Sequence, residues 1–251
     1  MISLGIDIGS RNTKIVIWDN SQKRILFSDY IATGVSIKET IDTLLIRAGD
    51  LRELIKYSCA TGYGRKMYKA ADSIKSEITC HAKACHMLFP NACTIIDIGG
   101  QDSKVITLSE DGNVEDFIMN DKCAAGTGRF LEMTANKLEC DISELSELAS
   151  KADREIPLNS TCVVFAESEI IGLLAKGERP ENIARAVNNS IAKRIYAQMA
   201  PLNWHAPIVF TGGVAQGSDL VYSIGKACGQ ELLIPEDPEI TGALGAAILA
   251  F

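Results

Sequence analysis

The chain has 251 residues, of which 47% are hydrophobic and 23% charged, and it carries a formal net charge of −7. That composition is typical of a globular protein of one or two domains and excludes a disordered chain, a collagen and a coiled-coil rod. The acidic balance argues against sequence-independent nucleic-acid binding, which depends on basic patches. No apolar run approaches the roughly 18 residues of a membrane span, and an aspartate comes too early for a signal peptide. We therefore expect a cytoplasmic protein with neither a nucleic-acid nor a membrane partner.

The first predicted elements belong to an internal repeat. Ile6–Val16 and Ile96–Ile106 share five identical positions, which are Ile, Asp, Ile, Gly and Lys. Each copy reads as an Ile-rich strand, a glycine-containing turn and a second strand; the strands are Leu4–Ile8 with Lys14–Trp18, and Thr94–Ile98 with Lys104–Leu108. The chain is therefore predicted to contain two copies of one β-meander.

The rest of the chain alternates helical patterns with short strands. In chain order these are a helix at Lys38–Ala48, a strand near Tyr57–Ala60, helices at Gly128–Leu138, Ser143–Ser150, Phe165–Ala175 and Asn182–Met199, a strand at Ile208–Phe210 and a last helix at Gly242–Phe251. Strands grouped with helices in two similar halves predict an α/β fold with two lobes around a cleft. We place the boundary near Pro90, which gives lobes at 1–90 and 91–251 and leaves the last helix free to pack back on the first lobe.

Three glycine-containing turns are candidates for a nucleotide site. The first comprises Gly9, Ser10, Arg11, Asn12, Thr13 and Lys14, and the second Gly99, Gly100 and Gln101. Turns with outward N–H groups bind anions, so two of them facing each other across a cleft suit a polyphosphate. Asp7 and Asp97 end the preceding strands and suit Mg²⁺, bound through water. The third turn comprises Gly212, Gly213, Val214 and Gln216, and with Gly242 it suits a purine or ribose. Plain tight turns are the alternative for each turn taken alone.

The repeat and the late Gly-Gly turn together resemble the superfamily of actin, sugar kinases and heat-shock-chaperone ATPases. The resemblance implies two ribonuclease-H-like lobes, phosphate loops at Asp7–Lys14 and Asp97–Lys104, and an adenosine loop at Thr211–Gln216. No Walker-type motif is present, which disfavours a P-loop nucleotidase. We expect Asp7, Asp97 and Gln101 to serve catalysis, with Asp97 and Gln101 positioning the attacking water.

Two of the eight cysteines stand apart from the others. Cys123 precedes a Gly-Thr-Gly turn that opens a helix, and Cys162 lies at a predicted helix start where Thr161 is a candidate cap. A helix N-terminus favours a thiolate. Two thiolates are too few for a [4Fe-4S] cluster, but a symmetric dimer would supply four. The spacing alone leaves two buried thiols as an alternative.

The strings Asn120–Glu132 and Ser160–Glu169 resemble those of the activator component of 2-hydroxyacyl-CoA dehydratases, a family that includes the ATPase subunits of benzoyl-CoA reductase. Further segments fit the family: Cys59–Arg65, Glu77–His81, Ile96–Val105 and Thr211–Gln216. Arg11 is bulkier than the residue usual there.

The resemblance implies a homodimer with one [4Fe-4S] cluster held by Cys123 and Cys162 of both subunits. It also implies ATP-driven transfer of a low-potential electron to an iron–sulfur dehydratase or reductase, with ferredoxin or flavodoxin as donor. Two alternatives stay open: a small-molecule kinase of the same superfamily, and a chaperone-like ATPase without a redox centre. Gly62–Arg65 is either a docking loop for the electron acceptor or a plain turn.

Overall fold

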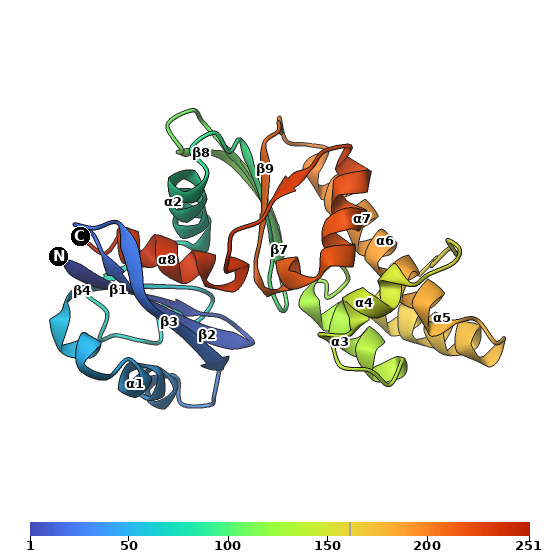
Figure 1. Cartoon of the computed structure of the whole chain (residues 1–251), viewed down its shortest axis with the longest axis horizontal. Coiled ribbons are helices and arrows are strands. Elements are labelled where there is room, and N and C mark those ends of the chain that lie inside the picture. The colour runs from blue at the N-terminus through green and yellow to red at the C-terminus, as the bar shows by residue number, and fades with distance from the viewer. Residues whose placement is uncertain (161) are drawn as a thin grey trace.

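The computed structural model describes residues 1–160 and 162–251; the expected cap, Thr161, lies outside them. The chain forms two five-stranded mixed sheets, each flanked by helices. Figure 1 shows the first sheet in blue and the second sheet in green and orange, with most of the helices beyond the second sheet. This confirms the predicted α/β fold of two similar lobes. No helix of the described ranges is long and apolar enough to cross a bilayer.

The first sheet has the strand order β3-β2-β1-β4-β5. Its strands are β1 (Ile2–Ile8), β2 (Asn12–Asp19), β3 (Arg24–Ala32), β4 (Ile55–Thr61) and β5 (Ser73–Ile74). β1, β2 and β3 form the predicted antiparallel meander, and β4 joins β1 in parallel. The core of this lobe contains apolar residues of β1 and β2, among them Ile6 and Ile15, packed against α1 (Ile37–Arg47).

The second sheet repeats that topology with the order β10-β9-β6-β7-β8. Its strands are β6 (Thr94–Ile98), β7 (Ser103–Leu108), β8 (Val114–Asn120), β9 (Ile208–Thr211) and β10 (Leu232–Leu233). β6, β7 and β8 are antiparallel, whereas β9 is parallel to β6. Every residue of β6 and of β7 is buried, which explains the near-continuous apolar pattern that predicted these strands.

Five helices follow the second meander or its parallel strand. They are α3 (Gly128–Lys137), α4 (Leu145–Ser150), α5 (Val163–Ala175), α6 (Pro180–Met199) and α7 (Ser218–Cys228). The first four confirm predicted helices, while α7 was not predicted. Gly225 interrupts its helical pattern, and glycine disfavours a helix interior. In the fold, however, a Cβ at Gly225 would lie only 2.9 Å from the carbonyl oxygen of Gln230. The close packing at this position therefore outweighs the low helix propensity of glycine.

Two helices connect the lobes. α2 (Glu77–Leu88) begins at the cap Ser76, whose hydroxyl accepts from the N–H of Thr79, and it packs against β6, β7 and β8. α8 (Thr241–Ile248) packs against β1, β2 and β4 of the other sheet. The two helices also pack against each other, with Gly245 against the backbone of Cys80 (Figure 1). A lobe boundary near Pro90 stays a prediction.

Candidate functional site

A cavity of about 640 Å³ is lined by residues of all three glycine-containing turns. The predicted residues that line it are Asp7, Gly9, Ser10, Arg11, Asn12, Lys14, Asp97, Gly99, Gly100, Gln101, Gly212, Gly213, Val214 and Gln216. The fold therefore brings together residues from both copies of the repeat and from the late Gly-Gly turn. Cys123 and Cys162 are not among the lining residues.

Two further predicted residues lie just outside the lining. Thr13 is buried, and its hydroxyl lies 2.9 Å from that of Thr33. Side chains alternate along a strand, so Thr13 points away from the cavity that its neighbours Asn12 and Lys14 face. Gly242 lies against the catalytic candidates: a Cβ there would be 3.1 Å from Oδ2 of Asp7.

An aspartate–lysine pair stands at the same place in each lobe. Asp7 lies opposite Lys14 in the β1–β2 register, and Asp97 lies opposite Lys104 in the β6–β7 register. The Lys14 Nζ is 3.1 Å from Oδ2 of Asp7, and the Lys104 Nζ is 2.9 Å from Oδ2 of Asp97. The repeated sequence thus produces a repeated ion pair on both sides of the cavity.

The second pair is enclosed by further charges. The Lys104 Nζ also lies 2.9 Å from Glu77 and 2.5 Å from Asp102, and Nε2 of His81 is 3.6 Å from Asp97. Burial by itself raises the pKa of Asp97, but His81 and Lys104 outweigh it and hold that pKa at about 2. Burial likewise opposes the charge of Lys104, yet its three carboxylate neighbours raise its pKa well above the ordinary value. Both groups therefore stay ionised.

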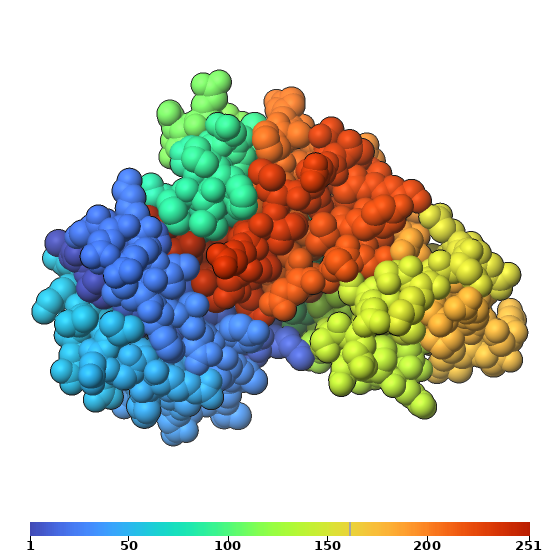
Figure 2. All heavy atoms as spheres, viewed as in Figure 1, coloured from blue at the N-terminus to red at the C-terminus, as the bar shows by residue number. Residues whose placement is uncertain are grey.

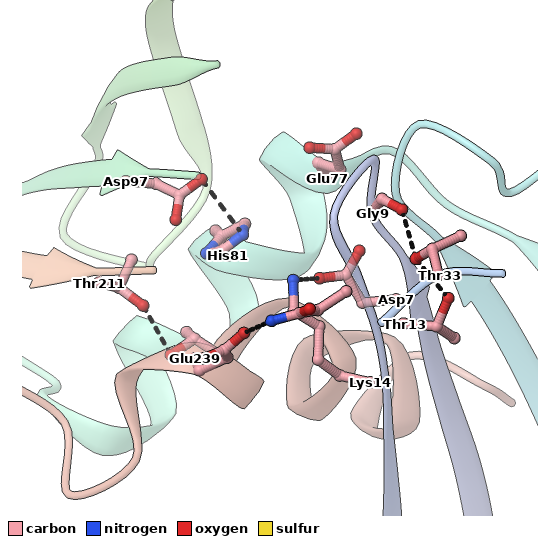
Figure 3. A network of polar contacts seen from close by, with 12 residues as sticks. Asp7, Gly9, Thr13, Lys14, Thr33, Glu77, His81, Asp97, Thr211 and Glu239 are labelled. Carbon is pink, nitrogen blue, oxygen red and sulfur yellow. Dashed lines mark hydrogen bonds and ion pairs between the residues drawn. The ribbon is translucent and has the colours of Figure 1, made fainter. Parts of the chain in front are cut away.

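The first pair is less deeply buried, since the Lys14 side chain is 17% exposed against 2% for Lys104. Figure 3 shows Asp7, Lys14 and Glu239 close together. Burial lowers the pKa of Lys14, but the Asp7 and Glu239 carboxylates outweigh it and raise that pKa above its ordinary value. Glu239 belongs to the short helix η3 (Pro238–Ile240) and accepts a hydrogen bond of 2.7 Å from the Asn12 amide. Gln216, at the end of η2 (Gly213–Gln216), donates to the other Glu239 oxygen over 3.4 Å. Glu239 thus connects the first glycine-containing turn with the third turn.

Two glycines allow the backbone to approach the aspartates. Gly62 follows β4 with a φ of +90°, and a Cβ there would lie 2.5 Å from Oδ1 of Asp7. Gly212 follows β9 with a φ of +91°, and a Cβ there would lie 2.8 Å from Oδ1 of Asp97. A side chain at either position would combine a strained backbone with a clash.

The second glycine-containing turn is hydrogen-bonded to the start of α3. The N–H of Gly128 donates to the carbonyl of Gly99, and the N–H of Arg129 donates to the carbonyl of Gly100, both over 2.9 Å. The segment that follows Cys123 is therefore joined directly to the wall of the cavity.

The two candidate cluster ligands differ in exposure. Cys123 is half-buried, and Nη2 of Arg194 donates to its Sγ over 3.3 Å. Cys162 is exposed at the N-terminus of α5, next to the exposed apolar side chains Val164 and Phe165. Within residues 1–160 and 162–251, no three His, Cys, Asp or Glu side chains converge on a possible metal ion.

Most of the other cysteines are poor ligands. Burial raises the pKa of Cys80 to about 12 and that of Cys228 to about 11, and it raises the pKa of Cys59, Cys85 and Cys140 as well. These thiols stay protonated near neutral pH, whereas a metal ligand must be a thiolate.

The sequence profile of the BadF/BadG/BcrA/BcrD ATPase family matches residues 4–250. The chain belongs to this family. The resemblance inferred from the cysteine motifs and the glycine turns is thereby confirmed.

Relatives within the family are similar over their whole length. The chain is 41% identical to the 2-hydroxyisocaproyl-CoA dehydratase activator of Clostridioides difficile, covering 100% of this chain and 95% of the relative. It is 40% identical to the (R)-2-hydroxyglutaryl-CoA dehydratase activating ATPase of Acidaminococcus fermentans, over 99% and 96%.

A solved structure of the C. difficile activator with bound ADPNP superposes with a TM-score of 0.93, at 41% identity over 100% of this chain and 94% of that one. A ROK family glucokinase from Streptomyces griseus has a TM-score of 0.63 at 13% identity, over 100% and 99%, and shares the fold alone.

Five charged residues that line the cavity received no site role from the sequence, namely Glu77, His81, Asp121, Glu132 and Glu239. A second repeat was available to find two of them. Glu77-Ile78-Thr79 at the start of α2 recurs as Glu239-Ile240-Thr241 at the start of α8. Glu77 lies 2.9 Å from Lys104 of the second lobe, and α2 packs against the sheet of that lobe. The Glu239 carboxylate raises the pKa of Lys14 of the first lobe, and α8 packs against the sheet of that lobe.

Proposed function

We propose that this chain is an ATP-dependent activator that transfers a low-potential electron to an iron–sulfur enzyme such as a 2-hydroxyacyl-CoA dehydratase. The observation that carries the proposal is the direct hydrogen bonding between the second phosphate turn and the helix that follows Cys123. Through these hydrogen bonds a movement of the cleft wall would be transmitted to the segment that contains Cys123. A kinase would not require such a connection. Full-length relatives named as dehydratase activators support the same reading.

The cleft supplies the groups that hold ATP or ADP with Mg²⁺. In this proposal the ammonium of Lys14 and the turn N–H groups bind phosphate, and the Gly212–Gln216 turn lies along the nucleoside. Asp7 and Asp97 bind Mg²⁺ through water. A carboxylate with a pKa of about 2 is a weak base. Asp97 therefore orients the attacking water, together with Gln101, and does not take its proton.

The residues of the chain fit a cluster shared by two copies. Cys123 and Cys162 would provide two thiolates per chain, and the described residues contain no group of three possible metal ligands. A second copy would bring the number to four, the usual ligand set of a [4Fe-4S] cluster. When bound, the cluster would supply one electron at low potential.

The protein groups around the two thiols favour an anionic centre. The N-terminus of α5 carries a partial positive charge next to Cys162, and Arg194 places a full positive charge next to Cys123. The exposed apolar residues Val164 and Phe165 beside Cys162 suit burial against another protein surface, either a second copy or the electron acceptor.

In this proposal nucleotide binding closes the two lobes and moves the Cys123 segment through the Gly99–Gly128 contact. Only a difference in ATP affinity between the open and closed arrangements can drive such a shift. The electron donor would be a small redox protein such as ferredoxin or flavodoxin.

Iron analysis after anaerobic reconstitution tests the proposal. We expect about two irons per chain in a dimer, with each of Cys123→Ala and Cys162→Ala abolishing the bound iron. Cys140→Ala is the matched control, because Cys140 is half-buried like Cys123, and it should leave the iron content unchanged. A colourless dimer, or four irons within one chain, would overturn the cluster. Phosphate transfer from ATP to a small molecule, insensitive to oxygen, would favour the kinase.

A further inference from the structure

Arg11 spans the nucleotide cleft. It lies in the turn between β1 and β2, where its carbonyl accepts a hydrogen bond of 2.7 Å from the N–H of Thr33. Its guanidinium Nη1 contacts Oε1 of Glu132, which lies on α3 in the other lobe. Figure 2 shows blue atoms of the first lobe next to yellow-green atoms of the helical segment of the second lobe. The ion pair therefore connects the two sides of the cavity.

The stem of Arg11 packs against the second phosphate turn. A Cβ at Gly100 would lie 3.0 Å from the Cβ of Arg11 and 3.4 Å from its Cδ. A side chain at Gly100 would crowd the stem of Arg11. Arg11 thus touches the second turn with its stem and α3 with its head group, while its backbone belongs to the first turn.

Glu132 lies on the helix that continues from Cys123. The first turn of α3 is bonded to the carbonyls of Gly99 and Gly100. Just before it, Gly126 has a φ of +88° and lies against Arg194, whose guanidinium donates to the Sγ of Cys123. Glu132 is therefore connected to Cys123 through the first turn of α3 and the contact of Gly126 with Arg194.

Glu132 has a second cation within reach. Nη1 of Arg129, one helical turn away, lies 3.8 Å from its other carboxylate oxygen. When Arg11 withdraws, Glu132 keeps a positive neighbour and is not left unpaired. Glu132 would therefore pair with both arginines while Arg11 is in place and with Arg129 alone after Arg11 withdraws, and an element with two such arrangements couples distant sites.

We propose that Arg11 and Glu132 form an inter-lobe latch, which holds the first phosphate turn against α3 and so couples closure around the nucleotide to the position of the Cys123 segment. Arg11 is then a positioning residue and not a phosphate ligand. The significance of moving Cys123 rests on the proposed function, but the latch itself acts on nucleotide binding alone.

A double-mutant cycle on the intact protein tests the latch. Arg11→Gln, Glu132→Gln and the double variant are compared for the dissociation constants of ADP and of a non-hydrolysable ATP analogue, measured anaerobically. Since partly exposed ion pairs are weak, we expect each of the three to weaken binding by the same factor of about two to five. Equal effects in the single and double variants are the signature of one shared interaction.

Hydrogen–deuterium exchange provides a readout that a purely local effect would not change. With the nucleotide analogue bound, amides of residues 123–137 should exchange severalfold faster in both single variants than in the parent protein. Arg47→Gln is the matched control, because Arg47 is 50% exposed against 53% for Arg11 and pairs with Asp29 inside the first lobe. It should change neither binding nor exchange.

Two outcomes would overturn the latch. If Arg11 is a phosphate ligand, Arg11→Gln alone weakens binding, Glu132→Gln leaves it unchanged or tightens it, and the two effects add. Unchanged exchange in residues 123–137 would also refute the coupling. A failure of the cluster proposal can be told apart from these two outcomes. It would appear as missing iron, and the nucleotide dissociation constants of the double-mutant cycle would still test the latch.

Discussion

The two lobes use the same aspartate–lysine pair in different surroundings. In the second lobe Lys104 is only 2% exposed and contacts Glu77, Asp97 and Asp102. In the first lobe Lys14 is 17% exposed and forms an ion pair with Asp7. The Lys104 ammonium therefore neutralises three carboxylates. The Lys14 ammonium forms an ion pair with Asp7 and still has N–H donors that can bind a ligand. The duplicated strands fix the geometry of the pair, and the residues that surround it decide its use.

The largest expected difference between the lobes follows removal of the lysines. Lys104→Met leaves three carboxylates without their shared cation, so the free energy of unfolding should fall by about 3–5 kcal/mol. Lys14→Met removes a more exposed cation and should cost less than half as much. Urea denaturation at neutral pH measures both values, and equal losses would contradict the difference drawn between the pairs.

The glycines that follow the parallel strands should instead behave alike. Gly62→Ala and Gly212→Ala each place a Cβ at a positive φ and against the backbone of the neighbouring parallel strand, at Ile8 of β1 or Ile98 of β6. Each should cost about 2–3 kcal/mol of unfolding free energy. Gly49→Ala is the control, since Gly49 has a φ of +58° but nothing within 4 Å of the added Cβ, and it should cost about 1 kcal/mol. A loss at Gly62 no larger than that at Gly49 would show that the close approach to Asp7 is not required.

Acid should weaken the second lobe through Asp97. Its pKa of about 2 lies below the ordinary 3.8, so the carboxylate contributes stability above pH 3.8 that disappears as the pH falls toward 2. The contribution is about 2 kcal/mol. The difference in unfolding free energy between the parent and Asp97→Asn should shrink by that amount from about pH 5 to about pH 2. A difference that stays constant across this range would refute the assignment.

The smallest effect in energy concerns ligand binding in the first lobe. Lys14→Met should weaken ATP binding by about tenfold, because one charge-assisted contact to phosphate is lost. A fluorescent ATP analogue measures the change. Lys38→Met, on α1 and outside the cavity lining, should bind the analogue normally. Unchanged binding in Lys14→Met would remove Lys14 from the phosphate site.

Much of the site could be predicted because it depends on local geometry. A tight turn between two antiparallel strands places Asp7 opposite Lys14, and the repeat places Asp97 opposite Lys104 in the same way. Strand alternation could not be applied to Thr13 until the start of β2 was known. The expected contact of Thr13 with phosphate stays a prediction, and its hydroxyl is bonded to Thr33.

The remaining residues of the site come from long-range packing. Glu77 and Glu239 reach the cleft because α2 and α8 each pack against the sheet of the other lobe, and in the sequence only the repeated Glu-Ile-Thr string marks them. Arg11 meets Glu132 for the same reason: a turn of one lobe touches a helix of the other. Helix α7 depends on a contact with the Gln230 carbonyl that its sequence does not reveal.

Each of α2 and α8 packs against the sheet of the other lobe, and this arrangement affects how the first sheet is completed during synthesis. The face of the first sheet that α8 covers includes the backbone of Gly5, against which Ala243 and Ala247 pack with no room for a side chain. The ribosome produces α8 only after every strand of both sheets has been synthesised. The face of the first sheet that α8 covers therefore stays without this helix until α8 has been synthesised, and apolar surface exposed in this way favours aggregation.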